Sequence, residues 1–181
     1  MDNEETILVI GATGLLGKIA AEQFLSDGYK VKALVRNTNA AKNILPKEIE
    51  LIRGDVTQYE TVLNAAKDVD YIHISISGGN DSKDILKVEL EGIRNVIKAA
   101  QKQNVTRISM ISGMSVNAEN QLHPSEKAKF LAEQDLEISG VKYTIFKPSF
   151  FMETLQRFVQ KNKALLWENK LIRFTLLRLK I

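Results

Sequence analysis

Several residue types that support chemistry are absent or rare in this sequence. It has no cysteine, which excludes disulfide bonds, thiol catalysis and thiolate metal sites. The two histidines, His73 and His123, are too few for a metal site without carboxylate partners, so we expect no metal. His73 falls within a predicted strand, where a hydrogen-bonded core residue is the simpler interpretation. The net charge of +3 is too small to indicate a nucleic-acid partner by itself.

Long hydrophobic runs are also missing. No apolar stretch approaches the length that spans a membrane, and the start Met1–Glu5 is too acidic for a signal peptide. The apolar and charged fractions, 44% and 26%, are typical of a globular protein, and 181 residues suffice for one domain with a core. We therefore expect a cytoplasmic protein without a membrane partner.

The most informative stretch is 6–36. Thr6–Ile10 is a continuous apolar run, typical of a strand buried on both faces of a parallel sheet. A glycine-rich turn follows, then a helical pattern with Leu16, Ala20 and Phe24 on one side, which ends at Asp27-Gly28. Lys30–Val35 completes a strand–turn–helix–strand unit.

Three glycines in this turn, at a three-residue spacing, indicate a dinucleotide site. Such a turn must be tight, must let a pyrophosphate approach bare backbone, and must let the helix pack closely on the strand. The helix start then offers free N–H groups and a positive dipole end to the phosphates. The predicted phosphate-binding residues are Gly11, Thr13, Gly14, Leu15, Leu16 and Gly17.

The rest of the chain alternates between strands and helices. Further strands are expected at 49–52, 70–76, 106–112 and 142–146. Helices are expected at 37–47, 81–103 and 124–139. Another helix should begin at the capping box formed by Thr57–Glu60. Crossovers of this length predict an α/β fold of the Rossmann type, a doubly wound parallel sheet with helices on both faces. In the C-terminal part of the chain, the sequence predicts a helix from Ser149 to about Gln160 and a strand at 171–177.

The Gly-x-x-Gly-x-x-Gly spacing resembles the short-chain dehydrogenase/reductase superfamily. Val9–Gly14 and Ser139–Pro148 resemble its atypical, NmrA-like NAD(P)-binding branch, over about residues 6–160. The resemblance implies one NAD(P)-binding Rossmann domain over 1–181, with about 149–181 the remnant of a shortened C-terminal substrate lobe. Large apolar side chains in that remnant suggest packing on the sheet or on a second subunit, and hence a possible homo-oligomer.

Residues after the second, third and fourth strands are the other predicted cofactor contacts. Arg36 directly follows the second strand, where an NAD-preferring site has an acidic residue that binds the ribose hydroxyls. A guanidinium there pairs with a 2′-phosphate instead, so we predict that the cofactor is NADP, with NAD possible. The resemblance places adenine against Asp55 and Val56, although Asp55 equally suits a Gly-Asp turn. Ser75 and Ser77 belong beside the nicotinamide ribose, or to an ordinary loop.

The residues for catalysis depart from the superfamily pattern, which pairs a tyrosine with a lysine four residues later. Lys129 matches the lysine, so we expect it at the nicotinamide ribose, but Ser125 replaces the tyrosine and is a far weaker acid. Ser112 ends the fifth strand where a serine steadies the substrate oxygen, although Gly113 fits that place equally well. A solvated helix lysine is the alternative for Lys129.

Two functions follow from these observations. One is an NADP(H)-dependent oxidoreductase of this atypical type acting on an unknown small molecule. The other is a non-catalytic NAD(P)-sensing or partner-binding regulator, favoured by the missing tyrosine and the shortened end, since hydride transfer needs a shaped, water-excluding pocket.

Cofactor choice is expected to depend on Arg36. Arg36→Asp removes a charge-assisted phosphate pair worth roughly 1.5–3 kcal/mol, so NADP should bind about ten- to a hundredfold more weakly. NAD affinity should stay the same or improve. Titration of both cofactors checks this, and a wild-type preference for NAD would show that the assignment is wrong.

Overall fold

The computed structural model describes residues 5–79, 81–149, 159–160, 163–167 and 174–178. The chain divides into two compact units, Met1–Lys147 and Pro148–Ile181.

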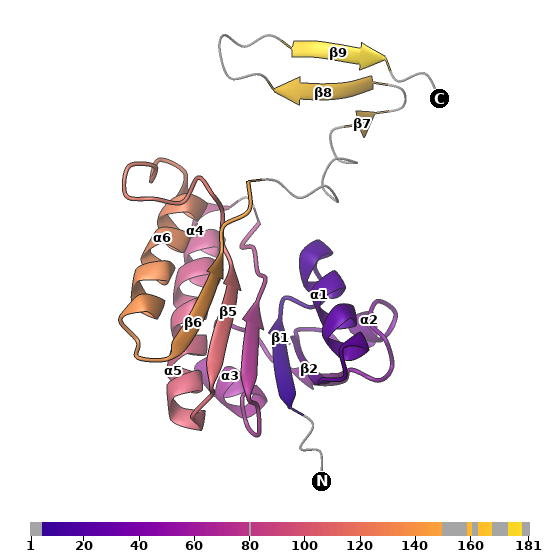
Figure 1. Cartoon of the computed structure of the whole chain (residues 1–181), viewed down its shortest axis with the longest axis vertical. Coiled ribbons are helices and arrows are strands. Elements are labelled where there is room, and N and C mark those ends of the chain that lie inside the picture. The colour runs from indigo at the N-terminus through magenta and orange to yellow at the C-terminus, as the bar shows by residue number, and fades with distance from the viewer. Residues whose placement is uncertain (1–4, 80, 150–158, 161–162, 168–173, 179–181) are drawn as a thin grey trace. The chain divides into compact units, whose positions relative to one another are not determined.

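The first unit is built on a six-stranded sheet in which every neighbouring pair is parallel. The strand order is β3-β2-β1-β4-β5-β6 (Figure 1). The strands are β1 (Thr6–Ile10), β2 (Lys30–Val35), β3 (Glu50–Arg53), β4 (Tyr71–Ile74), β5 (Arg107–Ile111) and β6 (Lys142–Phe146). This confirms the predicted doubly wound α/β fold. The order reverses between β1 and β4, where such sheets bind ligands beyond their strand ends.

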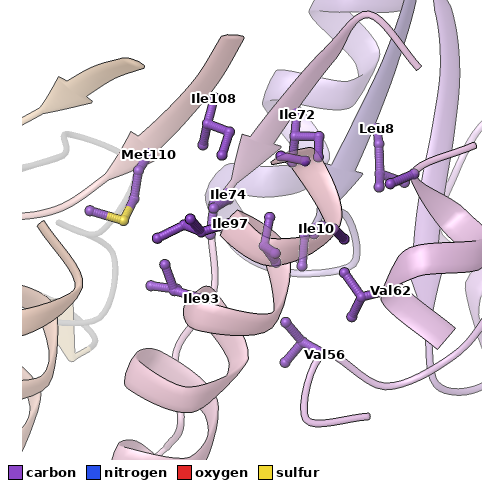
Figure 2. Packing of buried hydrophobic residues seen from close by; sticks show 14 of the residues in the cluster. Leu8, Ile10, Val56, Val62, Ile72, Ile74, Ile93, Ile97, Ile108 and Met110 are labelled. Carbon is purple, nitrogen blue, oxygen red and sulfur yellow. The ribbon is translucent and has the colours of Figure 1, made fainter. Parts of the chain in front are cut away.

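Helices cover both faces of the sheet. They are α1 (Leu15–Ser26), α2 (Thr38–Lys42), α3 (Tyr59–Ala65), α4 (Ser82–Ile85), η1 (Leu86–Gly92), α5 (Ile93–Gln103) and α6 (Pro124–Glu137). One apolar cluster lies between the sheet and α1 and α2. The larger cluster joins the other face to α3, η1, α5 and α6, as Figure 2 shows for Ile10, Ile74 and Ile93. No helix within the described residues has the length and apolar character needed to cross a membrane.

The helix predicted over 81–103 is present but changes its winding. Asp81 caps α4 through its carboxylate, η1 is a π-helix, and α5 ends at Asn104 in the left-handed conformation. Gly92, at the end of η1, lies against Val56, and a Cβ there would be 2.9 Å from the valine Cγ1. Inserted π turns are frequent at functional sites because they redirect side chains.

The capping box predicted at Thr57 is wrong. Helix α3 begins after Gln58, and among the described residues no side chain caps it. The Thr57 hydroxyl and N–H instead both donate to Asp55 Oδ1, at 2.8 and 2.9 Å. An ionised carboxylate is a strong acceptor, so the local Asp-turn takes the Thr57 N–H, which a capping box would donate to the Glu60 side chain.

The second unit contains a three-stranded antiparallel sheet of β7 (Val159–Gln160), β8 (Lys163–Trp167) and β9 (Phe174–Arg178). The helix predicted from Ser149 falls mostly on residues 150–158, which lie outside the described residues. Its expected end, Val159–Gln160, is strand because it pairs with β8. The strand predicted at 171–177 is confirmed over 174–177, and its first three residues lie outside the description. Strand β8 was not predicted.

His73 is a buried core residue, as predicted, with 5% of its surface exposed. Its Nδ1 lies 2.9 Å from Ser109 Oγ, and its ring meets the Phe24 ring edge-on at 5.5 Å. Burial lowers the pKa of His73 from 6.5 to about 4. The folded state therefore keeps this imidazole neutral at pH values where the unfolded chain protonates it.

This difference predicts acid sensitivity. Below pH 6.5 the unfolded state binds the extra proton, so stability falls as the pH drops toward the folded-state pKa near 4. Between pH 6.5 and 5 the loss should be about 1.5 kcal/mol. Gln at position 73 retains a partner for Ser109 and does not titrate. Urea unfolding at both pH values should show a smaller loss for His73→Gln than for the wild type, and an equal loss would contradict the assignment.

Candidate functional site

The glycine turn is held by close backbone contacts at the carboxyl end of β1. Gly11 has φ +92°, and any Cβ at this position would collide with the Ser75 carbonyl beyond β4. A Cβ on Gly17 would collide with the Gly11 carbonyl. These two glycines therefore let the turn fit against β4 and let α1 pack on the turn.

Gly14 has a different environment, at the N-cap of α1. Its N–H donates to Gly11 O at 2.9 Å, and an added Cβ would lie 3.2 Å from that oxygen. Among the described residues no side chain caps this helix, and Thr13, Gly14 and Leu15 are exposed. The first-turn amides of α1 are thus open to an anion from solvent, which is the arrangement that a pyrophosphate requires.

The predicted adenosine contacts lie at the carboxyl ends of β2 and β3. A shallow pocket of about 330 Å³ occurs there, lined by Arg36, Arg53, Gly54, Asp55, Gln58 and Thr61. Burial raises the pKa of Asp55, but hydrogen bonds from Thr57 and the positive charges of Arg36 and Lys87 outweigh it, so the net pKa lies below its usual value. Asp55 is therefore ionised and already held in the turn before α3, and its contact with adenine stays a prediction.

The loop after β4 carries Ser75 and Ser77 to the same edge of the sheet. Ser75 is half-buried and its N–H donates to Ile10 O at 2.9 Å, while Ser77 is exposed. The next residue, Gly78, packs so closely on Ile85 that a Cβ would collide with the helix backbone. The Gly78 N–H donates to Glu89 Oε1 at 2.8 Å.

Glu89 links this loop to the start of α6. Glu89 is 1% exposed and lies within the π-helical segment η1. The other oxygen, Oε2, accepts a hydrogen bond from Ser125 Oγ at 2.6 Å and lies 3.7 Å from Lys129 Nζ. Two of the predicted catalytic residues thus share one buried carboxylate. A buried carboxylate with one hydrogen-bond donor at each oxygen and a neighbouring ammonium is well compensated.

Ser112 belongs to a second buried network. Its hydroxyl donates to Glu133 of α6, and the opposite carboxylate oxygen lies 2.7 Å from Lys147 Nζ. Lys147 also donates to Val116 O at 3.0 Å. This network fixes the segment after β5 against α6 and the end of β6. Because the Ser112 hydroxyl already has an acceptor, its predicted contact with a substrate oxygen requires that bond to be exchanged.

A profile described as NAD(P)H-binding matches residues 11–165, most of the chain. The chain belongs to this NAD(P)H-binding family, within the atypical short-chain dehydrogenases/reductases and epimerases.

The proteins that are similar in sequence to this chain are named for different functions. The photosystem II assembly factor Ycf39 of Cyanophora paradoxa is 34% identical over 151 residues, which cover 83% of this chain and 47% of the relative. The uncharacterized sugar epimerase YhfK of Bacillus subtilis is 31% identical over 150 residues, covering 78% and 70%. The chain thus spans about half the length of the Ycf39 protein it matches.

The fold is also shared with solved structures. The Bordetella bronchiseptica enzyme WbmH, solved in complex with NAD+, has a TM-score of 0.71 at 19% identity, covering 81% of this chain and 57% of that chain. At this identity the likeness establishes the fold alone. The glycine turn and the uncapped start of α1 fit the dinucleotide binding that defines the NAD(P)H-binding family.

Sequence reasoning missed Glu89, although a signal was available. Glu89 falls four residues after Ile85 and four before Ile93, so it lies on the apolar side of its helix. A charged residue on such a stripe indicates a buried, paired group. The buried contacts of Glu133 were not predicted either, and Lys147 entered only as part of the Ser139–Pro148 run. The catalytic roles of Lys129, Ser112 and Ser125 stay predictions.

Gly14 and Gly17 should respond differently to substitution. Gly14→Val places a branched side chain where the pyrophosphate must lie, so dinucleotide binding should be lost. Because the N-cap residue changes, the free energy of unfolding should also fall by about 1 kcal/mol. Gly17→Ala forces a Cβ into backbone, so stability should fall by about 1–3 kcal/mol despite the better helix propensity of alanine. Calorimetric titration and thermal unfolding measure both effects. Unchanged affinity in Gly14→Val would remove the phosphate assignment.

Proposed function

We propose that this protein is an NADP(H)-dependent oxidoreductase of the atypical short-chain type, acting on a small-molecule acceptor. The observation that carries the proposal is the sharing of Glu89 by Gly78 and Lys129. One buried side chain ties the loop expected beside the nicotinamide ribose to the one cation expected there. This shared contact supports a position for Lys129 at the end of the site where the chemistry is expected.

The chain offers separate groups to each part of the cofactor. The open amides at the start of α1 suit the pyrophosphate, and Arg36 suits a 2′-phosphate at the adenosine end. In the loop after β4, Ser75, Ser77 and Gly78 are small residues, which leave room for the nicotinamide half, while Ile76 packs against the core. A bound reduced nicotinamide supplies a hydride to the acceptor.

Lys129 would then stabilise the negative charge that develops on the acceptor. Its side chain is 21% exposed, so the ammonium is partly shielded from water while it retains Glu89 as a counter-ion. An ammonium in this position stabilises a developing oxyanion and can donate a proton from Nζ. The Ser125 hydroxyl donates a hydrogen bond to Glu89 instead, and it is too weak an acid to replace a phenol.

A second candidate is a partner-binding protein that holds the cofactor without turnover. The 34% identity to an assembly factor favours it, because that relative is named for assembling a complex. Serine at position 125 favours it too, because the family tyrosine that handles the substrate proton is missing. Under this proposal the buried Glu89 network keeps the site rigid and takes part in no proton transfer.

The two candidates differ in turnover. NADPH oxidation should be followed with a panel of quinones and carbonyl compounds, after NADPH binding has been confirmed by fluorescence. Lys129→Met should lower kcat/KM by about a hundredfold or more. Lys127→Met, which removes an exposed lysine from the same helix, should change it less than twofold.

Vigorous turnover that survives Lys129→Met would show that the active site is misplaced. Tight NADPH binding by the wild type with no oxidation by any acceptor would favour the partner-binding protein.

A further inference from the structure

We propose that Arg53 is a second binding residue for the 2′-phosphate of NADP(H), acting with Arg36 as a two-arginine clamp. This inference rests on the proposed preference for NADP. Arg36 was recognised from its place after β2, but Arg53 was not singled out by any sequence pattern. Both arginines line the same pocket of about 330 Å³.

The sheet brings the two arginines together. Strands β2 and β3 are parallel neighbours, and Arg53 is the register partner of Val35, the residue before Arg36. The Gly54 N–H donates to Val35 O at 3.0 Å, so the pairing continues past the end of β3. Adjacent strands lie about 4.8 Å apart, so Arg53 lies beside Val35 and one residue out of register with Arg36 at the carboxyl edge.

The backbone that carries Arg53 is tightly fixed. A Cβ on Gly54 would lie 2.6 Å from Leu34 Cδ1 and 2.8 Å from Thr61 Cβ, so the chain passes here with no space to spare. The Thr61 hydroxyl adds hydrogen bonds to both the N–H and the carbonyl of Asp55. Arg53 therefore projects from a rigid strand end and not from a loose loop, which favours a defined binding geometry.

Among the residues that the structure describes, neither guanidinium is fixed by a short contact, although the charge of Arg36 lowers the pKa of Asp55. Within the described part of the chain, Arg36 and Arg53 make no hydrogen bond or ion pair, and both are exposed. Asp55 is the one acid of the pocket, and its Oδ1 is taken by Thr57. Two cations and one anion leave a net charge of +1 in a small concave area, which attracts an anion.

The chemistry of the pocket selects a phosphate monoester. Two guanidinium groups present planar pairs of N–H donors, and each matches two phosphate oxygens in a bidentate pair. Gln58 lines the same pocket with an exposed side chain and adds a neutral donor. A ribose 2′-hydroxyl carries no charge and gains little from these groups. The pocket should therefore discriminate between NADP+ and NAD+, which differ only in this phosphate.

Calorimetric titration of the full chain with NADP+ and NAD+ tests the clamp. Arg53→Ala should raise the Kd for NADP+ about tenfold and change that for NAD+ less than twofold. Arg53→Lys should lie between wild type and alanine, because the charge remains but the bidentate fork is lost. In Arg36→Ala/Arg53→Ala the two Kd values should approach each other.

Lys142→Ala is the matched control, because it removes one exposed positive charge at the start of β6, on the opposite edge of the sheet. It should leave both Kd values unchanged. The inference is overturned if Arg53→Ala weakens both cofactors equally or neither, while Arg36→Ala weakens NADP+ alone. A wild type that binds NAD+ as tightly as NADP+ overturns the clamp and the NADP preference together. A wild type that binds neither overturns the proposed function itself.

Discussion

The close approach of three backbone segments at Gly11 is the constraint on which the rest of the site depends. The turn after β1 lies directly against the Ser75 carbonyl on one side and accepts α1 at Gly17 on the other. A side chain at Gly11 or Gly17 would push these segments apart. The start of α1 would then move away from the switch point between β1 and β4, and its free amides would no longer face the ligand.

The carboxylate of Glu89 makes a comparable connection further along the same edge. It joins the β4 loop to α6 through Gly78 and Ser125, so two segments 47 residues apart in sequence are held by one side chain. The π turn in η1 shifts the helical register at this place, and we infer that it lets Glu89 point to the edge of the sheet. Glu133 repeats the arrangement with Ser112 and Lys147. The buried carboxylates of Glu89 and Glu133 thus hold the loops around the proposed substrate site against α6.

The sequence predicted the fold well because its signals are local. Apolar runs, glycine spacing and helix ends are readable within a few residues, and the six parallel strands follow from their alternation with helices. The Thr57 capping box failed because the Asp55 carboxylate accepts the Thr57 N–H in place of Glu60, and a motif does not show which acceptor wins. Glu89 and Arg53 were missed for another reason. Their roles arise from residues far apart in sequence, which only the packed helices and paired strands bring together.

The two ends of the proposed cofactor site use electrostatics in opposite ways. At the adenosine end, Arg36 and Arg53 are exposed, so water and salt screen them and their charges cost little to maintain. At the nicotinamide end, Glu89 and Glu133 are buried, and removal of one partner leaves a charge that the interior does not solvate. Cofactor choice can therefore vary by surface substitution with little effect on the fold. Residues around the proposed reacting groups lack that freedom, because the buried carboxylate that contacts Lys129 also holds the loop after β4 against α6.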